Sequence, residues 1–175
     1  MPDMAALPVQ SQPDMFPSSV HPQQQPIMTP YAQRTIRRAL NILERQLREP
    51  GAVFSSSNSV RNWLRLQMTL EEKEVFMVLF LDNQHRLIAH ETLFTGTINH
   101  TQVHPREVVK VALKHNAAAV IVAHCHPSGL AEPSLADRHI TERLKQALDL
   151  VEIRLPDHLI VGGMDIVSFA ESGWL

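Results

Sequence analysis

The sequence of 175 residues has little of several features that would define other classes of protein. Its one cysteine, Cys125, excludes an internal disulfide and fits a reducing compartment, so we expect a cytoplasmic protein. No apolar run approaches the roughly 18 residues of a membrane-spanning helix. The N-terminus has no basic segment followed by an apolar one, as a secretory signal would. The net charge of −2 argues against a strongly basic nucleic-acid-binding protein, although a local basic patch remains an alternative.

Several chemical motifs are also missing from the sequence. It has no glycine-rich phosphate loop, no pair of cysteines at metal-binding spacing and no nucleophile elbow of a serine hydrolase. Hydrophobic residues nevertheless make up 44% of the chain, which is enough to form a core. The sequence therefore has no signature of these three kinds of site.

The first 56 residues divide into two parts by composition. Residues 1–30 contain seven of the twelve prolines and only two charged residues, which predicts a disordered tail, with a short partner-binding peptide as the alternative. Residues 31–56 are predicted to form a basic helix and a linker, because an apolar stripe runs from Ile36 to Leu47 and arginines occupy the other faces. The arginines favour a solvated helix face, and contact with nucleic acid or an acidic partner is the alternative.

Residues 57–175 are predicted to form one α/β (α+β) domain, in which helices cover a mixed β-sheet. The first strand is nearly all apolar, so we expect it to be central in the sheet. After an initial helix, the predicted elements are strands 75–81 and 87–94, a helix from Pro105, a strand over 117–124, a helix over 134–150, and closing strands around a Gly162–Gly163 turn.

The most informative segment is "AHCHPSGLAEPSLAD", residues 123–137. Alternate side chains of a strand point to the same side, so His124 and His126 can aim both imidazoles at one point while Cys125 faces away. Pro127 ends the strand, and a strand end beside a turn is open to solvent and substrate. Neutral imidazoles are good ligands for Zn²⁺, so this segment is a candidate metal site.

A third ligand must come from another part of the fold. Asp137 follows in the first turn of the next predicted helix, where the helix dipole favours a carboxylate. The pair Ser134-x-x-Asp137 is also typical of a helix-capping box, and taken alone it indicates a cap more often than a ligand. The combination with the two histidines is more specific than either part.

Zinc-bound water needs a base to accept its proton. Glu91, on the returning strand of the predicted hairpin, is the candidate because apolar residues surround it in the sequence. The alternative is an exposed carboxylate on an edge strand.

These residues together resemble the signature of JAMM (MPN-plus) metalloproteases: Glu91, His124-x-His126-Pro127 and Ser134-x-x-Asp137. The segments "FTGTINHTQVHPREVVKVAL", "HCHPSG", "PSLAD" and "PDHLIVGG" resemble the bacterial RadC-like family more narrowly, over residues 57–175. The arginine-rich first helix is similar to that of the short RadC-like proteins found in prophages and mobile elements.

The resemblance implies the MPN/JAMM architecture, which is similar to that of cytidine deaminases, and a zinc-dependent hydrolase of amide or isopeptide bonds in a peptide or protein conjugate. It assigns Zn²⁺ to His124, His126 and Asp137. It also assigns the catalytic water to Glu91 and a hydrogen bond to the tetrahedral oxyanion to Ser134.

One departure and several alternatives accompany this assignment. Cys125 stands where the RadC-like family usually has asparagine, and a thiol is a strong zinc ligand, so a closed site is an alternative. His104 and His158 are expected to be structural or to support the ligands. A DNA-associated module and a zinc-stabilised scaffold without activity are the alternative functions.

Overall fold

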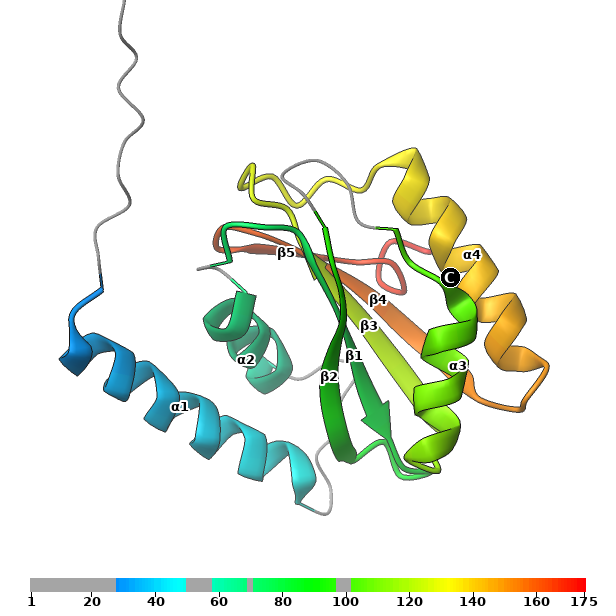
Figure 1. Cartoon of the computed structure of the whole chain (residues 1–175), viewed down its shortest axis with the longest axis horizontal. Coiled ribbons are helices and arrows are strands. Elements are labelled where there is room, and N and C mark those ends of the chain that lie inside the picture. Colours follow the sequence, from blue (N-terminus) through cyan, green and yellow to red (C-terminus); the bar gives the residue numbers. More distant parts are fainter. Residues whose placement is uncertain (1–27, 50–57, 69–70, 97–101) are drawn as a thin grey trace, which may run out of the picture.

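In a computed structural model of the chain, residues 28–49, 58–68, 71–96 and 102–175 are described. They form four helices and one sheet of five strands, so the predicted α+β class with a mixed sheet is confirmed (Figure 1). The predictions for residues 1–27 and for the linker from residue 50 lie outside the described residues. The elements are α1 (Pro30–Arg48), α2 (Asn58–Met68), β1 (Val75–Leu81), β2 (Leu87–Thr95), α3 (Pro105–Lys114), β3 (Ala119–Cys125), α4 (Leu135–Asp149), β4 (Arg154–Gly162) and β5 (Asp165–Ser168).

The strands lie in the order β2-β1-β3-β4-β5. Only β3 and β4 are parallel, and the other neighbours are antiparallel. All seven residues of β1 and all seven of β3 are buried, which agrees with their sequences, apolar throughout in β1 and apolar up to His124 in β3. The last turn lies at Gly163–Met164, one residue later than predicted, because Gly162 still belongs to β4.

Two layers of helices cover the two faces of the sheet (Figure 1). Leu47 of α1 and Trp63 of α2 pack on the face that carries Cys125. Val108 of α3 and Leu144 of α4 pack on the opposite face. None of the helices in the described ranges is both long and apolar enough to span a membrane.

Helix α1 confirms the apolar stripe predicted for it. Leu47 is buried, and Leu40 and Leu43 pack against the same core cluster. The helix begins at Pro30, one residue earlier than predicted, because the Thr29 hydroxyl accepts a hydrogen bond from the Ala32 N–H at 3.2 Å and caps it.

Candidate metal centre

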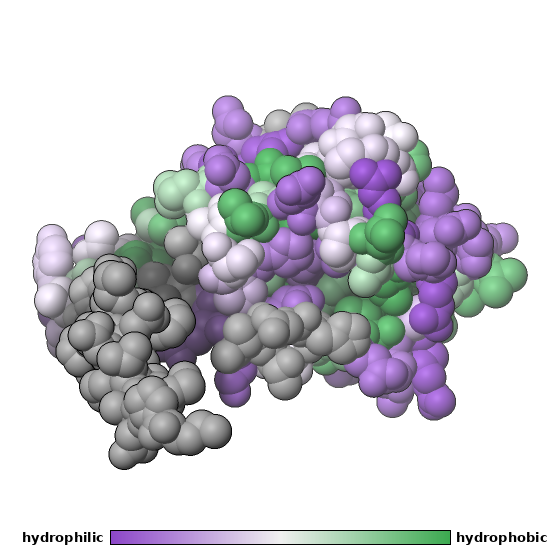
Figure 2. All heavy atoms as spheres, turned by 90° about the horizontal axis from the view of Figure 1, so that it is seen from above, coloured by the Kyte–Doolittle hydropathy of each residue, from purple (hydrophilic) through white to green (hydrophobic). Residues whose placement is uncertain are grey.

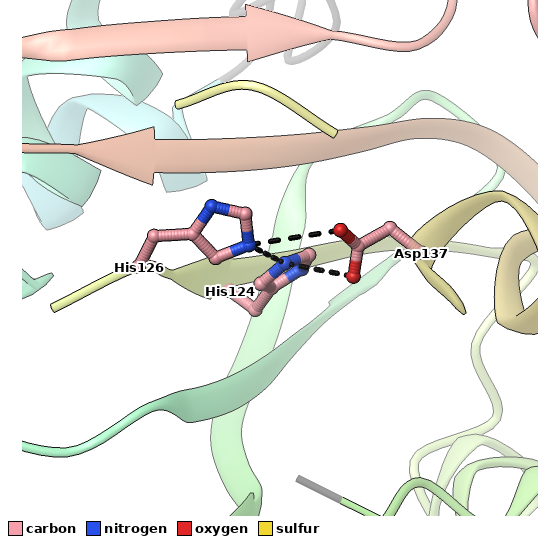
Figure 3. Close-up of side chains that lie close together, drawn as sticks. All are labelled: His124, His126 and Asp137. Atoms are coloured by element: carbon pink, nitrogen blue, oxygen red, sulfur yellow. Dashed lines mark hydrogen bonds and ion pairs between the residues drawn. The ribbon is translucent and has the colours of Figure 1, made fainter. Parts of the chain in front are cut away.

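Three of the predicted site residues come together at one end of β3 (Figure 3). His124 and His126 extend from β3 and the residue after it, and Asp137 extends from the first turn of α4. The two Nε2 atoms are 2.9 Å apart, and the Asp137 carboxylate oxygens lie 3.2 Å from His124 Nε2 and 3.6 Å from His126 Nε2. Neighbouring ligands of a tetrahedral zinc ion with bonds of about 2.05 Å are about 3.3 Å apart. The observed separations lie on both sides of that value, so the three residues could hold a metal ion.

Asp137 is a capping residue and a member of this group at once. One carboxylate oxygen, Oδ2, accepts hydrogen bonds from the backbone N–H of Ser134 at 2.7 Å and from its hydroxyl at 2.6 Å. The Ser134 hydroxyl oxygen accepts from the backbone N–H of Asp137 at 3.2 Å, which completes the capping box. The other oxygen, Oδ1, faces His124. The cap therefore fixes the direction of the carboxylate.

A chain of hydrogen bonds behind His124 decides which of its ring nitrogens carries hydrogen. The Thr141 hydroxyl has one hydrogen, and it donates this to the Asp137 carbonyl oxygen at 2.5 Å. Its oxygen must then accept from Nδ1–H of His158 at 2.6 Å. His158 Nε2 is left as an acceptor for Nδ1–H of His124 at 2.8 Å. This assignment leaves His124 Nε2 without hydrogen and directed at the centre of the group.

The neutral state of His158 supports this chain. Its side chain is fully buried, and burial holds the pKa of His158 well below its usual value, while a proton on the neighbouring His124 lowers it further. A neutral ring has one donor and one acceptor, as the chain requires. The expectation that His158 supports the ligands agrees with this geometry.

A carbonyl group orients His126 in the same way. Its Nδ1 lies 2.8 Å from the Leu130 carbonyl oxygen, which can only accept, so the hydrogen is on Nδ1 and Nε2 is bare. The backbone N–H of His126 also donates to the Val161 carbonyl at 2.8 Å. Two bare nitrogens at 2.9 Å repel each other unless a proton or a metal cation lies between them. The arrangement could therefore hold a cation between the two rings.

The contacts within the group also shift the pKa values of Asp137 and His126. Burial alone raises the pKa of Asp137, but the His124 and His126 rings donate hydrogen bonds to the carboxylate when they carry a proton on Nε2 in place of a metal, and these bonds outweigh burial and hold the pKa far below its usual value. The hydrogen bond with Asp137 raises the pKa of His126, against the opposing effect of burial. The carboxylate is therefore an anion at neutral pH. A proton on His126 competes with a metal for the same position.

The loop between β3 and α4 lies closely against the end of β4. A Cβ atom at Gly162 would lie 2.2 Å from the backbone nitrogen of Ala131 and 2.4 Å from the backbone carbon of Leu130. Only glycine leaves room for this approach, because backbone atoms cannot move aside as a side chain can. Gly162 thus allows the loop to bring the Leu130 carbonyl to His126.

Cys125 does not belong to the group. Its side chain is buried in the core on the α2 face, and its Sγ lies 3.5 Å from the Lys73 carbonyl oxygen. Burial raises the pKa of its thiol. The strand alternation predicted this direction, and the alternative of a closed site with Cys125 as a ligand is not supported by the geometry.

The structure does not bring Glu91 to the group, in contrast to the expectation from the sequence. Glu91 of β2 pairs with Val78 of β1, which in turn pairs with Val122 of β3. Glu91 is therefore level with Val122, two residues before His124, and the whole width of β1 separates it from β3. Its carboxylate oxygen lies 2.6 Å from Nε2 of His115. His115 also packs on the Phe80 ring.

A different carboxylate, that of Glu74, lies on the same side of the sheet as His124, His126 and Asp137, which we call the metal group. Phe76 pairs with His124, so continuing the antiparallel register places Glu74 opposite His126, just before β1 begins. Glu74 lines the cleft that contains His124, His126 and Asp137, and its charge contributes to the raised pKa of His126. Sequence reasoning missed Glu74 because it is the last of several charged residues before an apolar strand. The one indication in the sequence was that Glu74 is two residues before Phe76, so that both side chains point to the same side of an extended strand.

The metal group lies in an open cleft of about 610 Å³. Phe76, Val103 and Ile140 provide apolar parts of its wall, and Gln102 and Arg143 provide polar parts. His139 also lines the cleft. The end of the molecule at which α4 begins shows hydrophobic residues in small groups among polar ones (Figure 2).

The mixed sheet between two helical layers, with two histidines and an aspartate at the end of a central strand, defines a JAB-type domain with a candidate metal centre. Residues 54–174 match the family described as "RadC-like JAB domain", and the chain belongs to this family.

Three relatives show how far the similarity extends. The UPF0758 protein YkfG of Escherichia coli (strain K12) is 65% identical over 148 residues, which cover 85% of this chain and 94% of the relative. YfjY of the same strain is 59% identical over 161 residues, covering 92% of this chain and 100% of the relative. The UPF0758 protein PSHAa2643 of Pseudoalteromonas translucida (strain TAC 125) is 63% identical over 122 residues, covering 70% of this chain and 54% of that protein. The similarity to the first two therefore includes much of the region before the family domain.

Proposed function

We propose that the protein is a zinc-dependent hydrolase of the JAMM metallopeptidase or isopeptidase type, which cleaves an amide bond in a peptide or protein conjugate. The observation that carries the proposal is the pair of bare Nε2 atoms of His124 and His126 beside the Asp137 carboxylate, in an open cleft. Three nitrogen and oxygen ligands in an accessible site are typical of catalytic zinc, whereas structural sites use four protein ligands. A zinc ion held by these residues would polarise the amide carbonyl and lower the pKa of a coordinated water to about 7.

Glu74 is the residue that we propose to hold the attacking water and accept its proton. The register opposite His126 and the position in the cleft wall support this role. A carboxylate that has accepted a proton can then donate it to the leaving nitrogen, and such transfer contributes about 10²–10⁴-fold in rate. Glu91 is not proposed for this role, because its carboxylate is hydrogen-bonded to His115.

Ser134 has a positioning role in this proposal. Its hydroxyl hydrogen is donated to Asp137, so it orients a ligand. A hydrogen bond to the oxyanion, as the family resemblance implies, requires this hydroxyl to rotate away from Asp137. Substitution of Ser134 by alanine should thus lower zinc affinity as well as rate, whereas a purely oxyanion-binding residue would affect rate alone.

The metal part of the proposal is tested by the zinc content of the purified protein. After reconstitution and removal of free metal, we expect about one zinc per chain, as four-coordinate single-ion sites hold. His126→Ala should remove it, because one of the three ligands is lost. Cys125→Ala, at the adjacent position, is the matched control and should retain it. A native protein that binds no zinc, or a Cys125 variant that loses it, would contradict the proposal.

The hydrolytic part is tested by digestion of a proteome-derived peptide library, with new termini read by mass spectrometry. The zinc-loaded wild type should generate new termini, and Glu74→Gln should lower the rate by about 10²–10⁴-fold while keeping zinc. Glu91→Gln is the control and should retain most activity. Equal losses in the two variants, or none in Glu74→Gln, would refute the assignment of Glu74. Absence of cleavage by the wild type would favour the inactive zinc-stabilised scaffold.

A DNA-associated function is the second candidate, and its support is the exposed basic face of α1. Arg34, Arg37 and Arg38 are all exposed on this helix, which lies before the matched family residues 54–174. Anisotropy of a fluorescein-labelled single-stranded DNA at low salt tests this function. Binding that weakens steeply with salt and on substitution of these arginines by glutamine would support it.

A further inference from the structure

One face of α4 forms a wall of the cleft beyond the metal group. Ala136, His139, Ile140 and Arg143 line the cleft together, at the spacing of three and four residues that places side chains on one helix face. Arg143 comes six residues after Asp137, which corresponds to about 9 Å along the helix axis. Arg143 therefore lines the cleft from a backbone position further along α4 than Asp137.

Arg143 is the residue of this wall that carries a permanent positive charge. Its side chain is exposed, and it has no hydrogen bond or ion pair within the part of the chain that the structure describes. Two other arginines differ in this respect: Arg138 packs over the Trp174 ring at 4.1 Å, and Arg61 pairs with Glu171 at 2.6 Å. Arg143 is therefore available to a ligand in the cleft.

The charges in the cleft are separated along its length. The acidic residues of the cleft wall, Glu74 and Asp137, belong to the metal end, and Arg143 belongs to the other part of α4. Apolar side chains such as Phe76 and Ile140 provide the surface between polar groups. A ligand that fits this pattern has an amide bond at one end, an apolar or neutral segment, and an anion at the other end.

The geometry points to Arg143 as a specificity-determining residue that binds a carboxylate of the substrate. This inference rests on the proposed hydrolase function. An extended peptide advances about 3.3–3.6 Å per residue, so a distance of about 9 Å spans two to three residues. The carboxylate would thus lie two or three residues from the bond that is cleaved. A planar guanidinium group matches a carboxylate with two parallel hydrogen bonds, and His139, one turn nearer the metal group, offers another ring nitrogen.

The cleavage experiment compares the full-length, zinc-loaded wild type with Arg143→Gln, Arg143→Glu and the control Lys145→Gln. Lys145 lies on the same helix, is exposed and does not line the cleft. In the peptide library, the wild type and the control should enrich aspartate and glutamate at one position two or three residues from the new terminus. Arg143→Gln should lower this preference by about ten- to hundredfold, as expected for loss of a charge-assisted pair. Arg143→Glu should prefer lysine or arginine there, a gain that a misfolded variant cannot show.

The source of the carboxylate is distinguished by two synthetic peptides of one sequence. The first peptide has an internal glutamate and an amidated C-terminus. The second has glutamine in place of that glutamate, and its free C-terminal carboxylate lies at the same distance from the cleaved bond. Cleavage of the first indicates a side-chain carboxylate, and cleavage of the second indicates a terminal one. Both results support the inference. Equal rates for a neutral, amidated peptide would overturn it.

A binding arm separates failure of this inference from failure of the hydrolase proposal. Fluorescein-labelled glutamate and glutamine versions of the peptide are titrated against the wild type and Arg143→Gln. If no peptide is cleaved but the glutamate version binds more tightly, and Arg143→Gln removes the difference, then recognition stands and hydrolysis is refuted. If peptides are cleaved but neither cleavage nor binding prefers the acidic version, or Arg143→Gln changes neither, Arg143 has no role in specificity.

Discussion

Replacing Thr141 by valine tests the hydrogen-bond chain that prepares His124 for a metal. Valine has nearly the same shape as threonine but has no hydroxyl, and Thr141 is only 3% exposed. The substitution removes the hydrogen bond donated to the Asp137 carbonyl and the one accepted from His158. His158 then has a buried N–H without a partner, which costs about 1–3 kcal/mol of folding free energy.

The effect on metal binding follows from the tautomers. Without Thr141 to hold hydrogen on Nδ1, His158 relaxes by moving its hydrogen to Nε2, where it donates to His124 Nδ1. His124 must then carry its own hydrogen on Nε2, the atom directed at Asp137 and His126. Metal binding has to reverse both changes. We therefore expect zinc affinity to fall by about 10–100-fold, equivalent to about 1.4–2.7 kcal/mol.

The assay is competition for zinc against a chromophoric chelator at pH 7.5, with urea unfolding of the metal-free protein measured in parallel. Thr35→Val is the matched control, because the Thr35 hydroxyl makes the same kind of bond, to the Tyr31 carbonyl four residues earlier at 3.0 Å, on exposed α1. The control should leave zinc affinity unchanged. The hydrogen-bond chain has no role in metal binding if Thr141→Val weakens zinc binding by less than about threefold, well under the expected range, or if both variants weaken it equally.

Two further predictions concern the loop and the pH dependence of stability. Gly162→Ala should lower the free energy of unfolding by about 1–3 kcal/mol, or more, and weaken zinc binding, because the new methyl group meets the backbone of Leu130 and Ala131. Unchanged urea unfolding and zinc affinity would show that the loop moves aside freely. In the metal-free protein the pKa of His158 is lowered, so below about pH 6.5 the unfolded chain binds a proton that the folded chain excludes. The contribution of this residue to the free energy of unfolding is therefore complete above that pH. Below it, the contribution is lost at up to about 1.4 kcal/mol per pH unit. Urea unfolding at pH 7.5, 6.5 and 5.5 measures this loss, which should be smaller in His158→Gln; an identical pH dependence in both proteins would be inconsistent with a neutral buried His158.

The local pattern of the sequence was sufficient to predict much of this protein. A continuous apolar run predicted the central strand at Val75–Leu81, which is buried on both faces. Apolar periodicity predicted the stripe of α1, because burial of one helix face requires a fixed spacing of side chains. Strand alternation predicted that His124 and His126 point one way and Cys125 the other. These features depend on backbone geometry within a few residues, which a sequence shows directly.

The meeting of residues that are distant in the sequence depends on the fold of the whole chain. Glu91 and Glu74 are both carboxylates near apolar strands, and the register between β1, β2 and β3 determines that Glu74 lines the cleft while Glu91 contacts His115. His158 lies 34 positions after His124 in the sequence, and the parallel pairing of β3 with β4 brings it beneath that ring. Periodicity indicates which face of the sheet a side chain occupies, but its neighbours across the sheet depend on strand order and register, and these are determined by the packing of the whole chain.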